Sequence, residues 1–127
     1  MYIGIDLGTS AIKVILIDEN QKTIGHASYA LELLNPKNGH YEQDPDCWFH
    51  ATIQCFKELK NNYPRQFTAT QAIGISGQMH GATLIDRSGS VLRPCILWND
   101  TRSVNECSLM ENNYSFLREE TGNIAMP

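Results

Sequence analysis

The sequence predicts an α/β domain, and three observations lead to that prediction. Three short apolar segments follow one another within the first 31 residues, separated by polar turns. An apolar stripe at helical spacing follows between residues 44 and 64. Another strand pattern comes directly after that helix. This order of three strands, one helix and one strand predicts a helix packed on a sheet rather than a helical bundle.

The three leading segments are expected to form an antiparallel meander. Tyr2 to Asp6 alternates apolar and polar residues with a period of two. Ile12 to Ile17 is almost continuously apolar, and Lys22 to Leu31 is the third strand. The polar segment 18–21 between the last two strands has the composition of a turn.

A helix is expected after the polar loop 34–43. Asp44 is a good N-cap, Pro45 suits the first helical position, and Pro64 ends the helix. A strand from Ala69 to Ser76 follows. The apolar stripe of the helix consists of Trp48, Phe49, Ile53, Phe56 and Leu59.

The remainder of the chain predicts shorter elements. A second hairpin is expected over residues 82–93, followed by an extended run from Arg93 to Trp98. Asn99, Asp100 and Thr101 are candidate caps for a helix over about residues 102–111, and a further helix is expected over 114–120.

The composition is that of an ordinary globular chain of one domain's length. The 127 residues are 42% hydrophobic and 19% charged, with a net charge of −4. The ten basic residues are scattered, which argues against a nucleic-acid partner, because phosphate neutralisation needs clustered Lys and Arg. No apolar run reaches the roughly 18 residues of a membrane span, and no signal-peptide pattern follows Met1. We therefore expect a cytoplasmic protein with no membrane partner.

Cysteine and histidine spacings predict neither disulfides nor a structural metal. Cys47, Cys55, Cys95 and Cys107 include no CxxC pair. Cys47 and Cys55 fall on one predicted helix, about 12 Å of helical rise apart, which is too far for a disulfide. Free thiols are the simplest interpretation. The four histidines show no metal-ligand spacing.

A polar turn between the first two strands is a candidate phosphate site. Gly8 lets the backbone approach an anion, and Thr9 and Ser10 offer amides and hydroxyls to phosphate oxygens. Asp6 repels phosphate but can hold Mg²⁺ or its water shell, and Lys13 can add a positive charge. The alternative is an ordinary β-hairpin with an exposed aspartate, and the short motif alone does not decide between the two.

Two further segments are candidates for binding a small molecule. In GISGQMHGATLID, the residues Gln78, Met79 and His80 follow a strand and lie between glycines. The alternative is an interior histidine beside a core methionine. In RPCILWNDTRS, Trp98 offers an apolar face to a sugar ring, while the neighbouring Asn99, Asp100 and Arg102 can form hydrogen bonds or ion pairs. The alternative here is a helix start, with Trp98 as a hydrophobic staple.

Several motifs together carry a family resemblance. IGIDLGTSAIKVILID, with the β-β-β-α-β order, resembles the actin-like ATPase superfamily of ribonuclease-H-like folds, and within it the FGGY carbohydrate kinases. QDPDCWF, SGQMHGATL, RPCILWNDTR and TGN occur in the same order as in the xylulokinases of that family. The resemblance covers essentially all 127 residues.

The resemblance implies an activity, two cofactors and two sets of residues. The full-length enzyme is expected to phosphorylate D-xylulose, or a related ketose, to the 5-phosphate with ATP and Mg²⁺. The phosphate and magnesium set is Asp6, Gly8, Thr9, Ser10 and Lys13, with Asp6 near the transferred phosphate. The sugar set is Gln78, Met79, His80, Trp98, Asn99 and Asp100.

Xylulokinases are several times longer than this chain and have two lobes with the active site between them. The resemblance therefore implies that residues 1–127 are part of the N-terminal domain, without the C-terminal lobe and without the aspartate that serves the family as catalytic base. We name no catalytic base. We expect these residues alone to lack sugar phosphorylation, and an uncovered sheet face or edge to cause poor solubility or self-association.

Other interpretations stay open from the sequence. The chain could be a sugar-binding module without chemistry, or part of another FGGY pentulose kinase. An actin-like structural protein is a third alternative, but it has no use for GQMHG and LWND. Homodimerisation of the full-length enzyme is also left open.

Overall fold

The structure is a computed structural model that describes residues 1–127. Its main sheet has four strands in the order β3-β2-β1-β5. β1 (Tyr2–Leu7), β2 (Ala11–Ile17) and β3 (Thr23–Ala30) form an antiparallel meander, and β5 (Ala72–Gly77) pairs in parallel with β1. The predicted meander and its parallel fourth strand make a mixed sheet, as an α/β fold requires.

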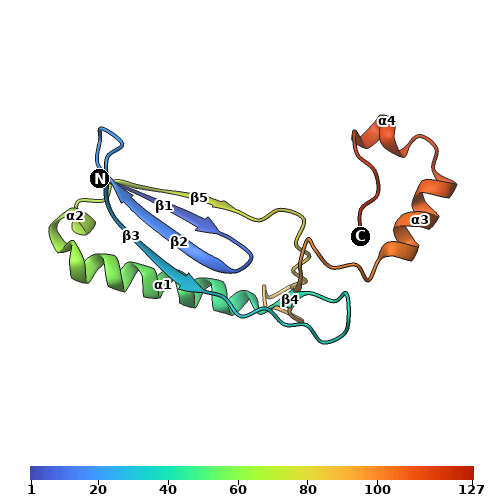
Figure 1. The fold of residues 1–127 in the computed structure, drawn as a ribbon, viewed down its shortest axis with the longest axis horizontal. Helices are drawn as coiled ribbons and strands as arrows, with labels where there is room; N and C mark the ends of the chain where they lie inside the picture. Colours follow the sequence, from blue (N-terminus) through green and yellow to red (C-terminus); the bar gives the residue numbers. More distant parts are fainter.

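One long helix, α1 (Pro45–Asn62), runs along one face of this sheet (Figure 1). Its start is the predicted one, because the Asp44 side chain accepts a hydrogen bond from the amide of Asp46 and Pro45 takes the first position. Asp46 in the first turn and Lys60 in the last turn also interact favourably with the helix dipole and stabilise the helix. Local sequence therefore sets where this helix begins.

The hydrophobic core lies between α1 and the meander. On β2, buried residues alternate with exposed Lys13 and Ile15, because successive side chains of a strand point to opposite faces. The helix contributes residues at a spacing of four, which share one face. The buried core consists of Ile3, Ile12, Val14, Leu16, Ala27, Leu31, Ala51, Cys55 and Leu59.

Phe49 does not belong to this core, and its predicted place in the apolar stripe is wrong. Its side chain is 72% exposed. Ala51 faces the sheet, and a residue two positions earlier lies about 200° around the helix. Trp48 and Phe56 do pack beside the core, as predicted.

A small second sheet and a short helix were not predicted. β4 (Glu42–Gln43), in the expected polar loop, pairs antiparallel with β6 (Cys95–Ile96). Figure 1 places β4 beyond the N-terminal end of α1. After α1, the chain forms α2 (Pro64–Thr68), so β5 begins three residues later than the predicted strand at Ala69.

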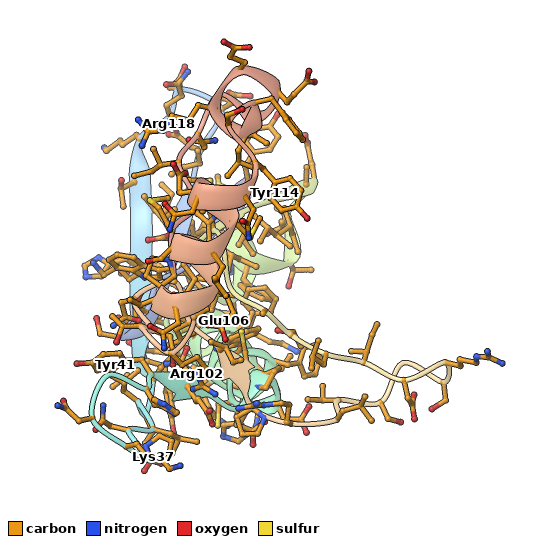
Figure 2. The ribbon with its side chains drawn as sticks, turned by 90° about the vertical axis from the view of Figure 1, so that its right-hand side faces the viewer. Lys37, Tyr41, Arg102, Glu106, Tyr114 and Arg118 are labelled. Carbon is orange, nitrogen blue, oxygen red and sulfur yellow. The ribbon has the colours of Figure 1, made fainter.

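The region after β5 is more open than predicted. The hairpin expected over 82–93 is present but short. Its bridge between Ile85 and Val91 is flanked by main-chain hydrogen bonds from Leu92 to Leu84 and from Asp86 to Ser90, both at 2.9 Å. This segment projects from the body of the molecule in Figure 2. α3 (Val104–Asn113) and α4 (Leu117–Thr121) lie beyond the end of the main sheet (Figure 1). Ser103, not Asn99, Asp100 or Thr101, precedes α3 as its N-cap, and it makes no side-chain capping bond. The cap prediction is therefore wrong.

Candidate active site

Asp6 lies near the carboxyl end of β1, on the sheet face opposite α1. Ile12, Val14 and Leu16 point toward α1, so Lys13 points away from it. Asp6 is the cross-strand partner of Lys13 on one side and of Ser76 on the other, so all three share that outer face. The Ser76 hydroxyl donates to Asp6 Oδ1 at 3.3 Å.

The outer face carries an open hollow of about 740 Å³ beside Asp6. Polar residues from all four strands of the main sheet line it, together with apolar ones such as Ile15 and Ile75. The polar lining consists of Asp6, Lys13, His26, Ser28 and Ser76. His80 is not among the lining residues. The structure therefore joins Asp6 to Lys13 and Ser76, but it does not bring His80 to the same hollow.

The turn after β1 leaves main-chain donors available. The Gly8 amide donates to the Ala11 carbonyl at 3.1 Å, and a Cβ on Gly8 would lie only 2.9 Å from that same oxygen. Glycine is therefore required for the tightness of the turn. The amides of Thr9 and Ser10 have no acceptor within the chain. Two adjacent unpaired amides in a turn are suited to binding an anion.

The side chain of Thr9 joins three segments that are far apart in the sequence. Its hydroxyl donates to Gln78 Oε1 at 2.9 Å and accepts from the Trp98 indole nitrogen at 3.0 Å. Gln78 follows β5 directly, and its main-chain N–H donates to the Leu7 carbonyl at 2.9 Å. The parallel pairing of β1 with β5 places these strand ends at one edge of the sheet. The predicted phosphate turn and two predicted sugar segments therefore meet at Thr9.

A buried glutamine holds this turn in place through its side-chain amide. Gln43 is fully buried, and its Nε2 donates to the Thr9 carbonyl at 2.8 Å and to the Glu32 carbonyl at 3.2 Å. Its Oε1 accepts from the Trp48 indole at 2.8 Å. All hydrogen-bonding atoms of the Gln43 amide group thus have partners, which a buried polar side chain requires. Gln43 opens the QDPDCWF motif, but we predicted no role for its side chain, because its contacts are with residues that lie elsewhere in the sequence.

Met79 and His80 form an exposed turn beyond Gln78. Met79 is 72% exposed, and His80 has a φ of 62°, in the left-handed region that few residues other than glycine adopt. The next residue, Gly81, packs tightly on Cys95, because a Cβ there would lie 3.1 Å from the Cys95 sulfur. This close approach anchors the turn to β6.

Two polar atoms in the predicted sugar segments are buried without a hydrogen-bond partner, namely Gln78 Nε2 and Asn99 Oδ1. Leaving such a group unpaired costs about 1–3 kcal/mol. One is a donor and the other an acceptor, so hydroxyl groups, which can do both, would match them.

Asp100 sits in a buried ion cluster. Its Oδ1 accepts from the main-chain amide and the Nε of Arg102 at 2.9 and 2.8 Å, and its Oδ2 accepts from Arg102 Nη2 and the Tyr41 amide, both at 2.7 Å. A carboxylate has about four acceptor positions. No free acceptor is therefore left for the sugar-binding role that we predicted for Asp100.

Glu42 and Arg93 complete this cluster. Glu42 Oε1 accepts from Arg102 Nη2 at 2.6 Å and also from Arg93. Figure 2 shows Tyr41 and Arg102 near the base of α3. Hydrogen bonds from Arg102 hold the pKa of the Asp100 and Glu42 carboxyls below their usual values, and hydrogen bonding to Asp100 raises the pKa of Arg102. The cluster joins the 41–42 segment to the Trp98 segment.

Comparison with known proteins places the chain in a family. Residues 1–127 match the N-terminal domain of the FGGY family of carbohydrate kinases. The chain belongs to this family. The xylulose kinase of Escherichia coli (strain K12) is 46% identical over 127 residues, which is all of this chain and 26% of that protein. The xylulose kinase of Bacillus subtilis (strain 168) is 43% identical over 112 residues, 88% of this chain and 22% of that protein.

Solved FGGY-type kinases also share the fold. A crystal structure described as a xyloylose kinase from Brucella ovis matches with a TM-score of 0.95 and 48% identity, over 99% of this chain and 26% of that one. Plasmodium falciparum glycerol kinase with ADP matches with a TM-score of 0.88 and 25% identity, over 99% and 26% of the two chains. These matches confirm the predicted actin-like ATPase fold. The FGGY chain described here spans about a quarter of the length of these relatives.

None of the helices has both the length and the apolar character that crossing a membrane demands. No group of three or more His, Cys, Asp or Glu side chains is arranged to hold a metal ion. Any metal at Asp6 would therefore depend on ligands other than a protein cluster.

Proposed function

We propose that the polypeptide carrying this chain is an ATP-dependent kinase of D-xylulose. It would transfer the γ-phosphoryl group to the sugar and release ADP and D-xylulose 5-phosphate. The observation that carries the proposal is the meeting of the phosphate turn with Gln78 and Trp98 at Thr9. The names of the relatives support ketose as the acceptor, and the glycerol kinase with ADP supports an adenine nucleotide as the donor.

On the phosphate side, bound ATP would supply the phosphoryl group and its negative charge. The unpaired amides of Thr9 and Ser10 would donate to phosphate oxygens, and Gly8 keeps the turn tight enough to present them. Lys13 points to the same face as Asp6 and would add positive charge there. Positioning and charge stabilisation supply most of the acceleration in phosphoryl transfer.

Asp6 is the residue that would serve Mg²⁺. Its carboxylate is exposed and accepts only from Ser76, so it keeps free acceptor positions. Mg²⁺ usually keeps several waters and binds through one or two carboxylates together with substrate phosphates. A single exposed carboxylate beside a phosphate turn fits that mode without a protein cluster.

On the sugar side, Gln78 and Asn99 offer the unpaired donor and acceptor described above. Trp98 is 54% exposed and would present its ring to the apolar face of a sugar. Met79 and His80, in the exposed turn after Gln78, would contact the ketose. Because these two atoms are buried, a bound sugar would satisfy them only if the Gln78 and Asn99 side chains turn toward it.

We further propose that residues 1–127 supply one wall of the active site and that a second lobe supplies the other. No catalytic base is assigned within these residues. Closure of the two walls would exclude water from the transferred group. In this arrangement, the 127-residue chain alone cannot position both reactants.

The test is a coupled assay of ADP release with the complete polypeptide. D-xylulose, other pentuloses and glycerol are compared as acceptors, each with and without Mg²⁺. The proposal expects the highest kcat/KM with D-xylulose, no turnover without Mg²⁺, and no turnover by residues 1–127 alone. Turnover with glycerol but not with any pentulose would contradict the sugar assignment. Binding of D-xylulose without ADP release would favour a sugar-binding module instead.

A further inference from the structure

We infer that Thr9 acts through its side chain as a positioning residue for the sugar segments, while only its main-chain amide faces the phosphate. The inference rests on the proposed kinase function and refines it. It differs from the expectation that the Thr9 hydroxyl itself binds phosphate.

The donor capacity of the hydroxyl leads to this assignment. A threonine hydroxyl has one proton to donate and two lone pairs. The proton of Thr9 is donated to Gln78 Oε1, and one lone pair accepts from the Trp98 indole. A phosphate oxygen needs a donor, so binding it would break the bond to Gln78. The main-chain amide of Thr9 has no acceptor within the chain and can therefore donate to phosphate.

The hydroxyl of Ser10 provides the contrast. Ser10 is exposed, and its hydroxyl makes no hydrogen bond in the chain. The two adjacent hydroxyls of the turn therefore have different roles. The Ser10 hydroxyl is free to bind an anion, and the Thr9 hydroxyl is bonded to the sugar segments.

The backbone of Thr9 is also held in place. Fully buried Gln43 donates to its carbonyl, and Gln43 is in turn held by the indole of Trp48 on α1. Thr9 thus connects the N-terminal end of α1 to the segments after β5 and β6. A rigid support of this kind is what keeps a binding residue in one geometry.

Both hydrogen-bond partners of the Thr9 hydroxyl lie next to residues that are proposed to contact the sugar. Gln78 is followed by Met79 and His80, and Trp98 is followed by Asn99. Trp98 is more than half exposed, so its indole hydrogen bond to Thr9 is an important restraint on its ring. Loss of the Thr9 hydroxyl would release both segments and weaken ketose binding without removing a phosphate ligand.

The kinetic test compares three variants of the complete polypeptide. Thr9→Val keeps the side-chain shape without the hydroxyl, and we expect the KM for D-xylulose to rise about five- to tenfold, as for the loss of a hydrogen bond. The KM for ATP should stay within about twofold of the wild-type value. Thr9→Ser restores the hydroxyl and should recover the wild-type KM for the sugar. Ser10→Ala, the matched control, should instead raise the KM for ATP.

A second measurement does not depend on turnover. In protein with isotope-labelled tryptophan, the indole resonance of Trp98 is identified by its loss in Trp98→Phe. We expect Thr9→Val to move this resonance and Thr9→Ser to leave it near its original position. The double variant Thr9→Val/Trp98→Phe should raise the sugar KM by less than the product of the single effects, because both remove the same bond.

The outcomes distinguish failure of the proposed kinase function from failure of the positioning role of Thr9. Absence of any sugar phosphorylation by wild-type protein would overturn the kinase function, and the indole resonance would still decide whether Thr9 orients Trp98. An unmoved Trp98 resonance in Thr9→Val, or a raised KM for ATP with an unchanged KM for sugar, would overturn the role of Thr9. If Thr9→Val fails to fold, Thr9→Ala takes its place in both measurements, and an unmoved Trp98 resonance in that variant would overturn the role of Thr9.

Discussion

Arg102 donates to both carboxylate oxygens of Asp100, from Nε to Oδ1 at 2.8 Å and from Nη2 to Oδ2 at 2.7 Å. Asp100 is only 3% exposed, so this two-point ion pair is made largely away from water. Glu42 shares the same guanidinium. Two buried carboxylates therefore depend on one arginine for their neutralising charge, with Arg93 as a second cation at Glu42.

Replacing Arg102 with Met should strongly destabilise the fold. The change leaves Asp100 buried without its cation, and breaking a buried pair in this way costs about 3–5 kcal/mol. Urea denaturation followed by circular dichroism measures the free energy of unfolding. Arg118→Met is the matched control, because the pair of Arg118 with Glu111 is exposed and such pairs are worth about 0–1 kcal/mol. Equal effects of the two changes would contradict the structural role of the Asp100 cluster.

Stability should fall with decreasing pH because of the same cluster. The folded-state pKa values of Asp100 and Glu42 lie below their usual values, so the unfolded chain binds protons first as the pH falls. Their contribution is fully present above the unfolded pKa values of about 4 and is lost progressively as the pH drops toward the lower folded values. Urea midpoints between about pH 6 and pH 3 would record the decline.

The variant Asp100→Asn isolates this contribution to the pH dependence. An asparagine does not titrate, so the variant should be less stable at neutral pH and show a shallower decline toward acid. A decline as steep as that of the wild type would mean that other carboxylates cause the acid sensitivity.

Two residues of α1 should lose very different amounts of stability on truncation to alanine. Leu59→Ala removes a fully buried side chain from the core and should cost about 2–5 kcal/mol of unfolding free energy. Phe49→Ala removes a mostly exposed ring and should change it by no more than about 0.5 kcal/mol. Thermal or urea denaturation of both variants gives the comparison. A large loss at Phe49 would show that another part of the complete polypeptide covers this ring.

Asp6→Asn should impair catalysis while leaving folding intact. Asp6 is exposed and accepts only a 3.3 Å hydrogen bond, so its removal costs little stability. If it holds the water shell of Mg²⁺, its loss should lower kcat/KM about 10- to 100-fold and raise the Mg²⁺ concentration needed for half-maximal rate. Mg²⁺ titrations of the complete polypeptide test this. Asp86→Asn, in the exposed turn between Ile85 and Val91, is the control that should behave as wild type.

Much of the fold was predictable because its signals are local. Asp44 and Pro45 mark the start of α1 whatever surrounds them. The almost continuous apolar run of β2 predicted a strand, but it did not show which of its two faces is buried. Phe49 shows where a local pattern fails. Its apolar character suggested burial, but the direction of the helix face is set by packing of Ala51, Cys55 and Leu59 on the sheet.

The candidate site was only partly predictable. The DLGTS turn, the Gln78 segment and the Trp98 segment were all recognised as candidates from residue types. Their contacts were not, because Thr9 and Trp98 are separated by 89 positions and no local rule pairs them. The same holds for Asp100, whose residue type fits a sugar ligand as well as a buried ion pair.

Sequence information was enough to predict the α/β class, the meander, the limits of α1 and the family membership. These depend on periodicity, caps and motifs, which act over a few neighbouring residues. The folded chain was needed to show that the Thr9 hydroxyl binds Gln78 and Trp98, that Gln43 supports the turn, and that Asp100 pairs with Arg102. The physical reason is that a hydrogen-bonding group has few donor and acceptor positions, and the partners that occupy them come from distant segments brought together by the packing of the sheet and helix.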